Sequence, residues 1–377
     1  MIFQRDKGTK IYGDFNYICI NFCNLRSKID NRMHVRVEYP KGMENMKNLY
    51  VIGNGFDIAH GLPSRYIDFK EWLQNNQEDI YDKLVEYFPD VANEDLEWWS
   101  DFENNLDTLS AHEAIYRNAN ENYPDFGSDD FRDADYQRAE YETEQEIINL
   151  YFEIQEAFVS WIKQLGEPTR NYRFKLPSNT FFLTFNYTDT LQDYYKISSD
   201  DIFFLHGRES VGEPLIFGHA GNPSHIHEGT DMDYPDPPDN LNPEDYEQWY
   251  EQNSDDFIVI SSREAAQRAI LEFQKPTEEL ISRYRIFFGS CYFLESITFL
   301  GFAFSNVDIP YLKAIFNQID LKKIKITAYY YSENDLISIK SFMSNYDIPQ
   351  YNLRILHSSC HPHKEYITPE IPNLFDD

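Results

Sequence analysis

A glycine-rich turn stands directly after the apolar run Leu49–Ile52, a run typical of a buried parallel strand. The turn reads Gly53-Asn54-Gly55-Phe56-Asp57-Ile58-Ala59-His60-Gly61-Leu62-Pro63. In α/β proteins such a turn brings backbone N–H groups to a phosphate at the start of the next helix. We therefore expect Gly53, Asn54 and Gly55 to bind phosphate. Asp57 can cap the helix. The third glycine of the dehydrogenase fingerprint is missing, because the next glycine is Gly61.

Three further predicted strands each end in residues that could do chemistry. Asn186 and Asp189 follow one of them, and His206 follows another. After the third stand a glycine and two polar side chains, Gly301, Ser305 and Asp308. Ligands of open α/β sheets bind at the carboxyl ends of the strands. At that edge an amide can orient a ligand, and a histidine that titrates near neutral pH can accept a proton.

The glycine turn resembles two known sequence patterns. Gly-x-Gly, five residues and then Gly-Leu-Pro is the spacing of the sirtuin cofactor loop, with Gly53, Gly55, Gly61 and Pro63 in register. The stretch 48–63 closely resembles the start of the bacterial AbiH family of abortive-infection (phage-defence) proteins, which are usually grouped with sirtuin-like domains. The resemblance covers about residues 47–70, 180–220 and 297–317.

The resemblance implies NAD as ligand or substrate. It implies that Asn186 faces the cofactor ribose and that His206 is the catalytic histidine. The family's Asp position is taken by Thr188, with Asp189 one place later, so Asp189 departs from the pattern. The remaining site residues, Asp57, Gly301, Ser305 and Asp308, would then hold the ribose or the adenosine half, with Gly301 and Ser305 in the glycine–serine turn of sirtuin-like domains.

These residue types suit cleavage of the bond between nicotinamide and ribose. The cationic nicotinamide leaves as a neutral base, so no general acid is needed, and the transition state resembles an oxocarbenium ion. Asn186 would orient the ribose or a water, and His206 would act as general base. We therefore expect an NAD glycohydrolase that serves as an anti-phage effector.

Three alternatives remain open at this point. The same pocket could sense NAD or an ADP-ribose-type nucleotide without cleaving it. The protein could instead be a toxin that transfers ADP-ribose to another target. It could also be a degenerate, structural sirtuin-like scaffold, for which Thr188 is the best support.

Composition narrows the classes of function. The 377-residue chain carries a net charge of −31, which would repel nucleic-acid backbones and argues against a nucleic-acid partner. Its four cysteines fit a reducing compartment and cannot form the four-thiolate zinc ribbon of deacylating sirtuins. We expect no metal and no membrane span, and hence a cytoplasmic protein. A phage-derived trigger is the expected partner, and a homo-oligomer is left open.

The chain as a whole predicts an α/β fold. We expect a Rossmann-like, doubly wound, mainly parallel sheet of sirtuin-like type with a large helical insertion. We predict strands at 49–52, 180–185, 202–205, 215–217, 297–302, 324–331 and 353–356. We place the helical insertion at about 75–165 and an acidic loop at about 222–256, within one domain spanning 46–377. Residues 1–45 differ in charge, so we expect an extension that is not native or lacks structure, with the natural start at Met43 or Met46.

Overall fold

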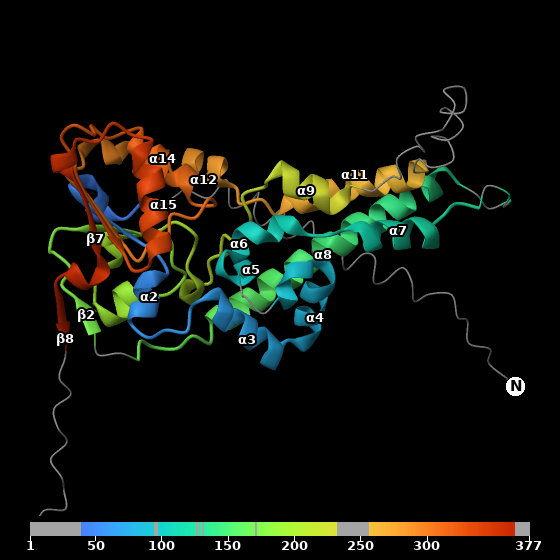
Figure 1. The fold of residues 1–377 in the computed structure, drawn as a ribbon, viewed down its shortest axis with the longest axis horizontal. Helices are drawn as coiled ribbons and strands as arrows, with labels where there is room; N and C mark the ends of the chain where they lie inside the picture. Colours follow the sequence, from blue (N-terminus) through green and yellow to red (C-terminus); the bar gives the residue numbers. More distant parts are fainter. Residues whose placement is uncertain are drawn as a thin grey trace, which may run out of the picture.

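The computed structural model describes residues 39–93, 97–125, 127, 129, 132–169, 172–231 and 256–365. A sheet with its covering helices and a separate helical lobe lie side by side (Figure 1). Most of the predicted extension, residues 1–38, lies outside the described residues. The part that is described packs into the fold, because Met43 and Met46 are buried in the core beside the first strand.

Six parallel strands form the main sheet, in the order β4-β3-β1-β5-β6-β7. They are β1 (Asn48–Ile52), β3 (Phe181–Thr184), β4 (Ile202–Phe204), β5 (Ser296–Leu300), β6 (Lys325–Tyr330) and β7 (Leu353–His357). Counted along the chain, this is the strand order of the dinucleotide-binding fold. The predicted Rossmann-like α/β sheet is therefore confirmed, and its order reverses between β1 and β5, the topological switch point.

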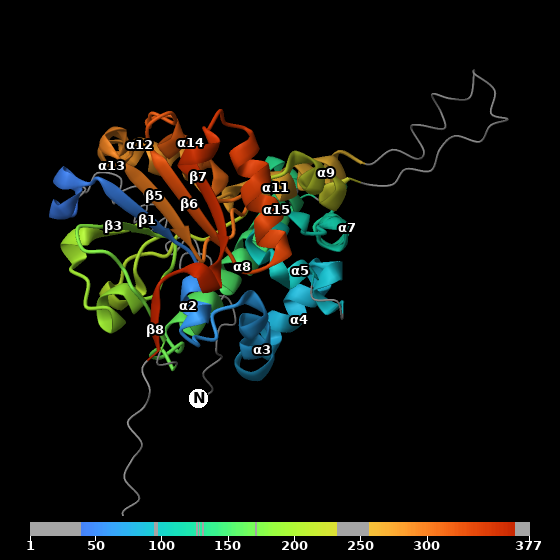
Figure 2. The same ribbon diagram turned by 60° about the vertical axis from the view of Figure 1, so that its left-hand side comes forward.

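Both faces of the sheet are covered, which explains why the central strands β1, β3 and β5 are largely apolar. Leu49 and Val51 point into the larger core, and Ile52 points into the smaller core on the opposite face. Figure 2 shows the helices of the larger core along one side of the strands: α12 (Thr277–Arg283), α13 (Arg285–Ser290), α14 (Ile309–Phe316) and α15 (Glu333–Ser344). The smaller core is covered by α2 (Gly55–Ala59) and by the ribbon of β2 (Tyr172–Phe174) and β8 (His363–Glu365).

The helical lobe is built from two insertions between strands of the sheet. The first, between β1 and β3, holds α3 (Tyr66–Asn76), α4 (Glu78–Tyr87), α5 (Glu97–Ser100), α6 (Phe102–Asn105), α7 (His112–Glu121) and α8 (Arg138–Ile162). The second, between β4 and β5, holds α9 (Pro223–Thr230) and α11 (Phe257–Glu272). The long helices α8 and α11 pack on each other around a separate hydrophobic core. No helix among the described residues is both long and apolar enough to cross a membrane.

Two local predictions differ from the structure. The predicted strand at 215–217 is irregular chain, whose Leu215 and Phe217 pack into the core of the helical lobe instead of pairing with a strand. The predicted loop at 222–256 begins as α9, because Asn222 accepts a hydrogen bond from the Ser224 N–H (3.1 Å) and Pro223 occupies the first turn. Residues 232–255 lie outside the described residues.

Candidate functional site

The glycines of the turn let two loops touch at the switch point between β1 and β5. The Gly55 N–H donates to the Gly301 carbonyl oxygen at 2.8 Å. A Cβ placed on Gly53 would lie 2.7 Å from that same oxygen, closer than side chains are found. Gly301 itself has φ +65°, and its Cβ would lie 2.2 Å from the Phe56 nitrogen. The backbone of Gly301 therefore packs directly against Gly53 and Gly55, the glycines that we expected to bind phosphate.

Asn54 and Gly61 hold the ends of this turn. The Asn54 side chain donates to the Ser64 carbonyl oxygen (2.5 Å) and accepts from the Ser64 hydroxyl (2.6 Å). Gly61 has φ +81° and its N–H donates to the Ile58 carbonyl oxygen, so it ends α2 in the way that C-terminal glycines commonly do. Asn54 and Gly55 are exposed at the carboxyl end of β1, and Gly53 is buried.

Asp57 joins the β1 turn to the end of β3. The prediction that Asp57 caps α2 was wrong, because Asn54 occupies the cap position and the Asp57 carboxylate is buried. The Thr188 hydroxyl donates to Asp57 Oδ2 at 2.5 Å, and the Asn186 amide donates to the Gly53 carbonyl oxygen at 3.1 Å. Thr188, the residue that departs from the family pattern, is thus the hydrogen-bond partner of Asp57.

Burial raises the pKa of Asp57 to about 6, although the hydroxyl of Thr188 opposes the shift. A carboxyl whose pKa is higher in the folded chain than in the unfolded chain costs stability as the pH rises through that range. In Asp57→Asn the unfolding free energy, relative to the unmodified chain, should therefore rise between pH 4 and pH 7. At about 1.4 kcal/mol per pK unit the full effect is about 3 kcal/mol, most of which develops between pH 4 and pH 7. Urea unfolding at both pH values measures it.

Asp320→Asn is the control for this prediction. Asp320 is exposed, and the Lys323 ammonium lowers its pKa, so its carboxylate stabilises the fold at the higher pH. In Asp320→Asn, the unfolding free energy relative to the unmodified chain should therefore fall between pH 4 and pH 7. If the unfolding free energy of Asp57→Asn relative to the unmodified chain stays constant from pH 4 to pH 7, the pKa of Asp57 is not raised by folding.

Asp189 pairs with a residue that follows β4. The Arg208 Nε–H donates to Asp189 Oδ1, and the Arg208 guanidinium also lies 5.3 Å from the centre of the Phe204 ring. The side chain of Asp189 is 13% exposed. The structure therefore gives Asp189 an arginine partner, separate from the contacts that join Asp57 and Asn186.

His206 lies in an aromatic enclosure at the end of β4. Its ring meets Phe185 edge to face, with ring centres 5.2 Å apart, and Tyr187 and Tyr311 lie on other sides. Burial, and then the Lys275 ammonium, hold the pKa of His206 well below its usual range, so the imidazole is neutral near pH 7. His206 Nε2 is 3.7 Å from Asp308 Oδ1. The structure thus brings together two predicted site residues from different strands.

Ser305 and Asp308, predicted to hold the adenosine half, face the helical lobe. The Asn104 amide donates to the Ser305 hydroxyl at 3.1 Å, and that hydroxyl is 3.3 Å from Asp101 Oδ1. Burial raises the pKa of Asp308 to about 6, against the opposing effect of Lys275. The loop after β5 is therefore tied both to the β1 turn and to the lobe.

Two charged residues of this site have no counterpart among the sequence predictions. The Lys275 ammonium donates to Glu103 Oε2 at 2.8 Å and to Asp308 Oδ1 at 3.2 Å. Glu103 Oε1 also accepts from the Tyr66 hydroxyl at 2.6 Å. Lys275 and Glu103 come from separate insertions, so no local motif marks them. The only sequence signal is that Glu103 follows the aromatic stretch at 98–102.

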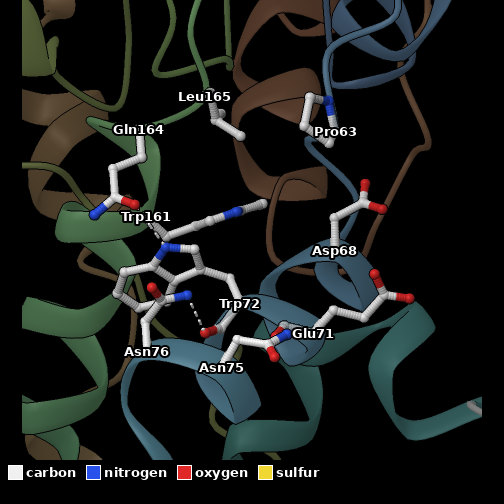
Figure 3. A pocket seen from close by; sticks show the side chains of 9 residues that line it. All are labelled: Pro63, Asp68, Glu71, Trp72, Asn75, Asn76, Trp161, Gln164 and Leu165. Carbon is white, nitrogen blue, oxygen red and sulfur yellow. Dashed lines mark hydrogen bonds between the residues drawn. The ribbon is translucent and has the colours of Figure 1, made fainter.

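Two cavities among the described residues lie elsewhere. One, of about 330 Å³, lies on the helical lobe between α3 and the end of α8, where Trp72 Nε1 donates to Gln164 Oε1 at 3.0 Å (Figure 3). The other, of about 670 Å³, lies where β3 begins. The part of the predicted site around Asn186 and His206 is closed by contrast, since both are less than one-tenth exposed. Among the described residues, no His, Cys, Asp or Glu cluster is arranged to hold a metal ion.

The sequence model of one protein family, bacteriophage abortive infection AbiH, matches residues 49–330. The chain belongs to the AbiH family. The match confirms the predicted AbiH membership and runs from β1 to the end of β6. All the predicted site residues of this AbiH protein lie inside the matched range, as do Glu103 and Lys275. A search of the curated proteins found no match.

Proposed function

We propose that this AbiH protein acts in abortive infection by binding NAD at the β1–β5 switch point and cleaving its nicotinamide–ribose bond. The supporting observation is the strand order, which places the ends of β1, β3, β4 and β5 at one edge of the sheet. Those four ends carry Gly53, Asn186, His206 and Asp308. In sheets of this order, ligands bind in the crevice outside the carboxyl ends of the strands.

The protonation states suit this reaction. A neutral His206 can accept a proton from the attacking water, and its Nε2 has no hydrogen-bond partner among the described residues. Asn186 at the end of β3 would orient the ribose. With pKa values of about 6, the carboxylates of Asp57 and Asp308 are largely ionised at pH 7 and would stabilise a cationic ribose.

Unpaired buried atoms support a ligand in this place. Besides His206 Nε2, the Tyr311 hydroxyl is fully buried without a hydrogen-bond partner among the described residues. Such groups usually have a partner, and a polar ligand group would supply one. The Gly55 N–H, in contrast, is already bonded to Gly301, so a pyrophosphate on the turn would have to break that bond.

A second candidate function is NAD sensing without cleavage. It is favoured by the contacts that close the site, because Asn104 and Lys275 hold Ser305 and Asp308 from the side of the helical lobe. A ligand that reaches these residues would shift the lobe, and such a movement could report binding to another part of the defence response.

Both candidate functions are tested by incubating the purified chain with NAD. Calorimetry measures binding, and chromatography measures nicotinamide release and NAD loss. We expect both binding and release, together with a fall of cellular NAD in infected cells. Binding without release would support the sensor, and no binding at millimolar NAD would contradict both.

A further inference from the structure

A buried group of three charges crosses the boundary between the helical lobe and the sheet. Lys275 stands between α11 and α12, Glu103 lies in α6, and Asp308 immediately precedes α14. Their side chains are 2%, 8% and 16% exposed, respectively. We call these residues the lysine triad.

The lysine triad is stable only as a unit. Burial by itself would lower the pKa of Lys275, but the carboxylates of Asp308 and Glu103 outweigh burial and raise it. Removing one member of a buried ion group leaves an uncompensated charge, which is costly. The position of the ammonium therefore depends on both carboxylates, one from the lobe and one from the sheet.

Lysine and histidine meet at the same oxygen atom. Asp308 Oδ1 is 3.2 Å from Lys275 Nζ and 3.7 Å from His206 Nε2. The first distance is a hydrogen bond and the second is too long for one. Among the described residues, the rings of Tyr187 and Tyr311 also lie near His206, and burial raises the pKa of both hydroxyls.

We propose that Lys275 is a positioning residue of the site. It binds Asp308 Oδ1 and so leaves His206 Nε2 free, and through Glu103 it makes this arrangement depend on how the helical lobe docks on the sheet. The effect of Lys275 on the rate of NAD cleavage rests on the proposed function, whereas its effect on the pKa and contacts of His206 does not. A trigger that displaces α6 would thereby alter the state of His206 without touching it.

The decisive variant is Lys275→Met, which keeps most of the length of the side chain and removes its charge. Asp308 is then free to bond His206, so the pKa of His206 should rise and its Nε2 should become occupied. NMR titration of labelled histidine in the full-length, ligand-free chain measures the first effect. For NAD cleavage, kcat should fall by about 100-fold with little change in KM. Lys275→Arg, which keeps the positive charge, should have a pKa of His206 and a kcat close to those of the unmodified chain.

Lys83→Met is the matched control. Lys83 pairs with Glu153 at 2.5 Å within the helical lobe, and both side chains are more than one-third exposed. This variant should leave the His206 titration and kcat unchanged. An unchanged pKa of His206 in Lys275→Met would overturn the proposal. If the unmodified chain does not cleave NAD, the proposed function fails, but the titration still decides the role of Lys275.

Glu103→Gln tests the link to the lobe even if Lys275→Met does not fold. Glutamine can still accept from Tyr66 through its one carbonyl oxygen, but it loses both the negative charge and the oxygen that accepts from Lys275. We expect amide hydrogen exchange at residues 305–309, on the sheet side, to accelerate by at least about tenfold. The reason is that a hydrogen bond to a charged group contributes more free energy than a tenfold change in rate represents. Unchanged exchange there, with Lys83→Met as reference, would show that the lobe does not set the position of Asp308.

Discussion

His206→Ala and Asn186→Ala are each expected to abolish nicotinamide release from NAD while the sheet remains folded. Loss of a general base costs about 10²- to 10⁴-fold in rate, so His206→Ala should fall to the background. Asn186→Ala removes the ribose-orienting amide and its 3.1 Å bond to the Gly53 carbonyl oxygen. Chromatographic nicotinamide release per folded molecule measures both, and calorimetry should show that His206→Ala still binds NAD.

His219→Ala is the control for the histidine. His219 is also fully buried, and burial likewise lowers its pKa, but it lies in the helical lobe, where its Nε2 bonds to the Ile270 carbonyl oxygen at 2.9 Å. This variant should lose stability without losing turnover per folded molecule. Equal turnover in His206→Ala and the unmodified chain would exclude His206 as the base.

Gly301→Ala should destabilise the fold and weaken NAD binding together. The new Cβ would lie 2.2 Å from the Phe56 nitrogen, and Gly301 already has φ +65°, a conformation that alanine adopts with strain. Strain and overpacking together predict a loss of about 3 kcal/mol in unfolding free energy. Because the β1 turn must shift to relieve the clash, NAD affinity should fall as well. Urea unfolding and calorimetry measure the two effects.

Gly166→Ala separates strain from steric clash. Gly166 has φ +71°, but an added Cβ would meet nothing within 4 Å. Its loss of stability should be limited to the conformational strain, about 1 kcal/mol, with NAD affinity unchanged. Equal losses of unfolding free energy in Gly301→Ala and Gly166→Ala would show that the contact between the β1 turn and the loop after β5 does not contribute to stability.

The sequence is informative about the sheet because each strand combines a local apolar run with a polar end. Runs at 49–52, 180–185 and 297–302 become β1, β3 and β5, and the residues after them gather at one edge. The run at 215–217 is also apolar, but it forms no strand, and its Leu215 and Phe217 pack into the core of the helical lobe. Apolar composition thus predicts burial more securely than it predicts strand pairing.

The site itself is only partly visible in the sequence. Local rules assign Asp57 to a helix cap, whereas the folded chain places it against Thr188, 131 residues away. Glu103 and Lys275 are 172 residues apart and come from two insertions that meet only in the folded lobe. Such pairs arise from tertiary packing, so periodicity and turn chemistry carry no signal for them.

The central place of β1 has a consequence for how the chain is made. β1 lies between β3 and β5, and contacts of Asn48 reach Asn179, 131 residues later, and Ser296, 248 residues later. At a synthesis rate of about 5–20 residues per second, the second neighbour emerges roughly 10–50 s after β1. Until then the edge of β1 that pairs with β5 has no partner, although β3 can pair with the other edge earlier, and such long-range pairings slow folding. Production of this protein should therefore depend on chaperones that shield β1 until its last partner is synthesised.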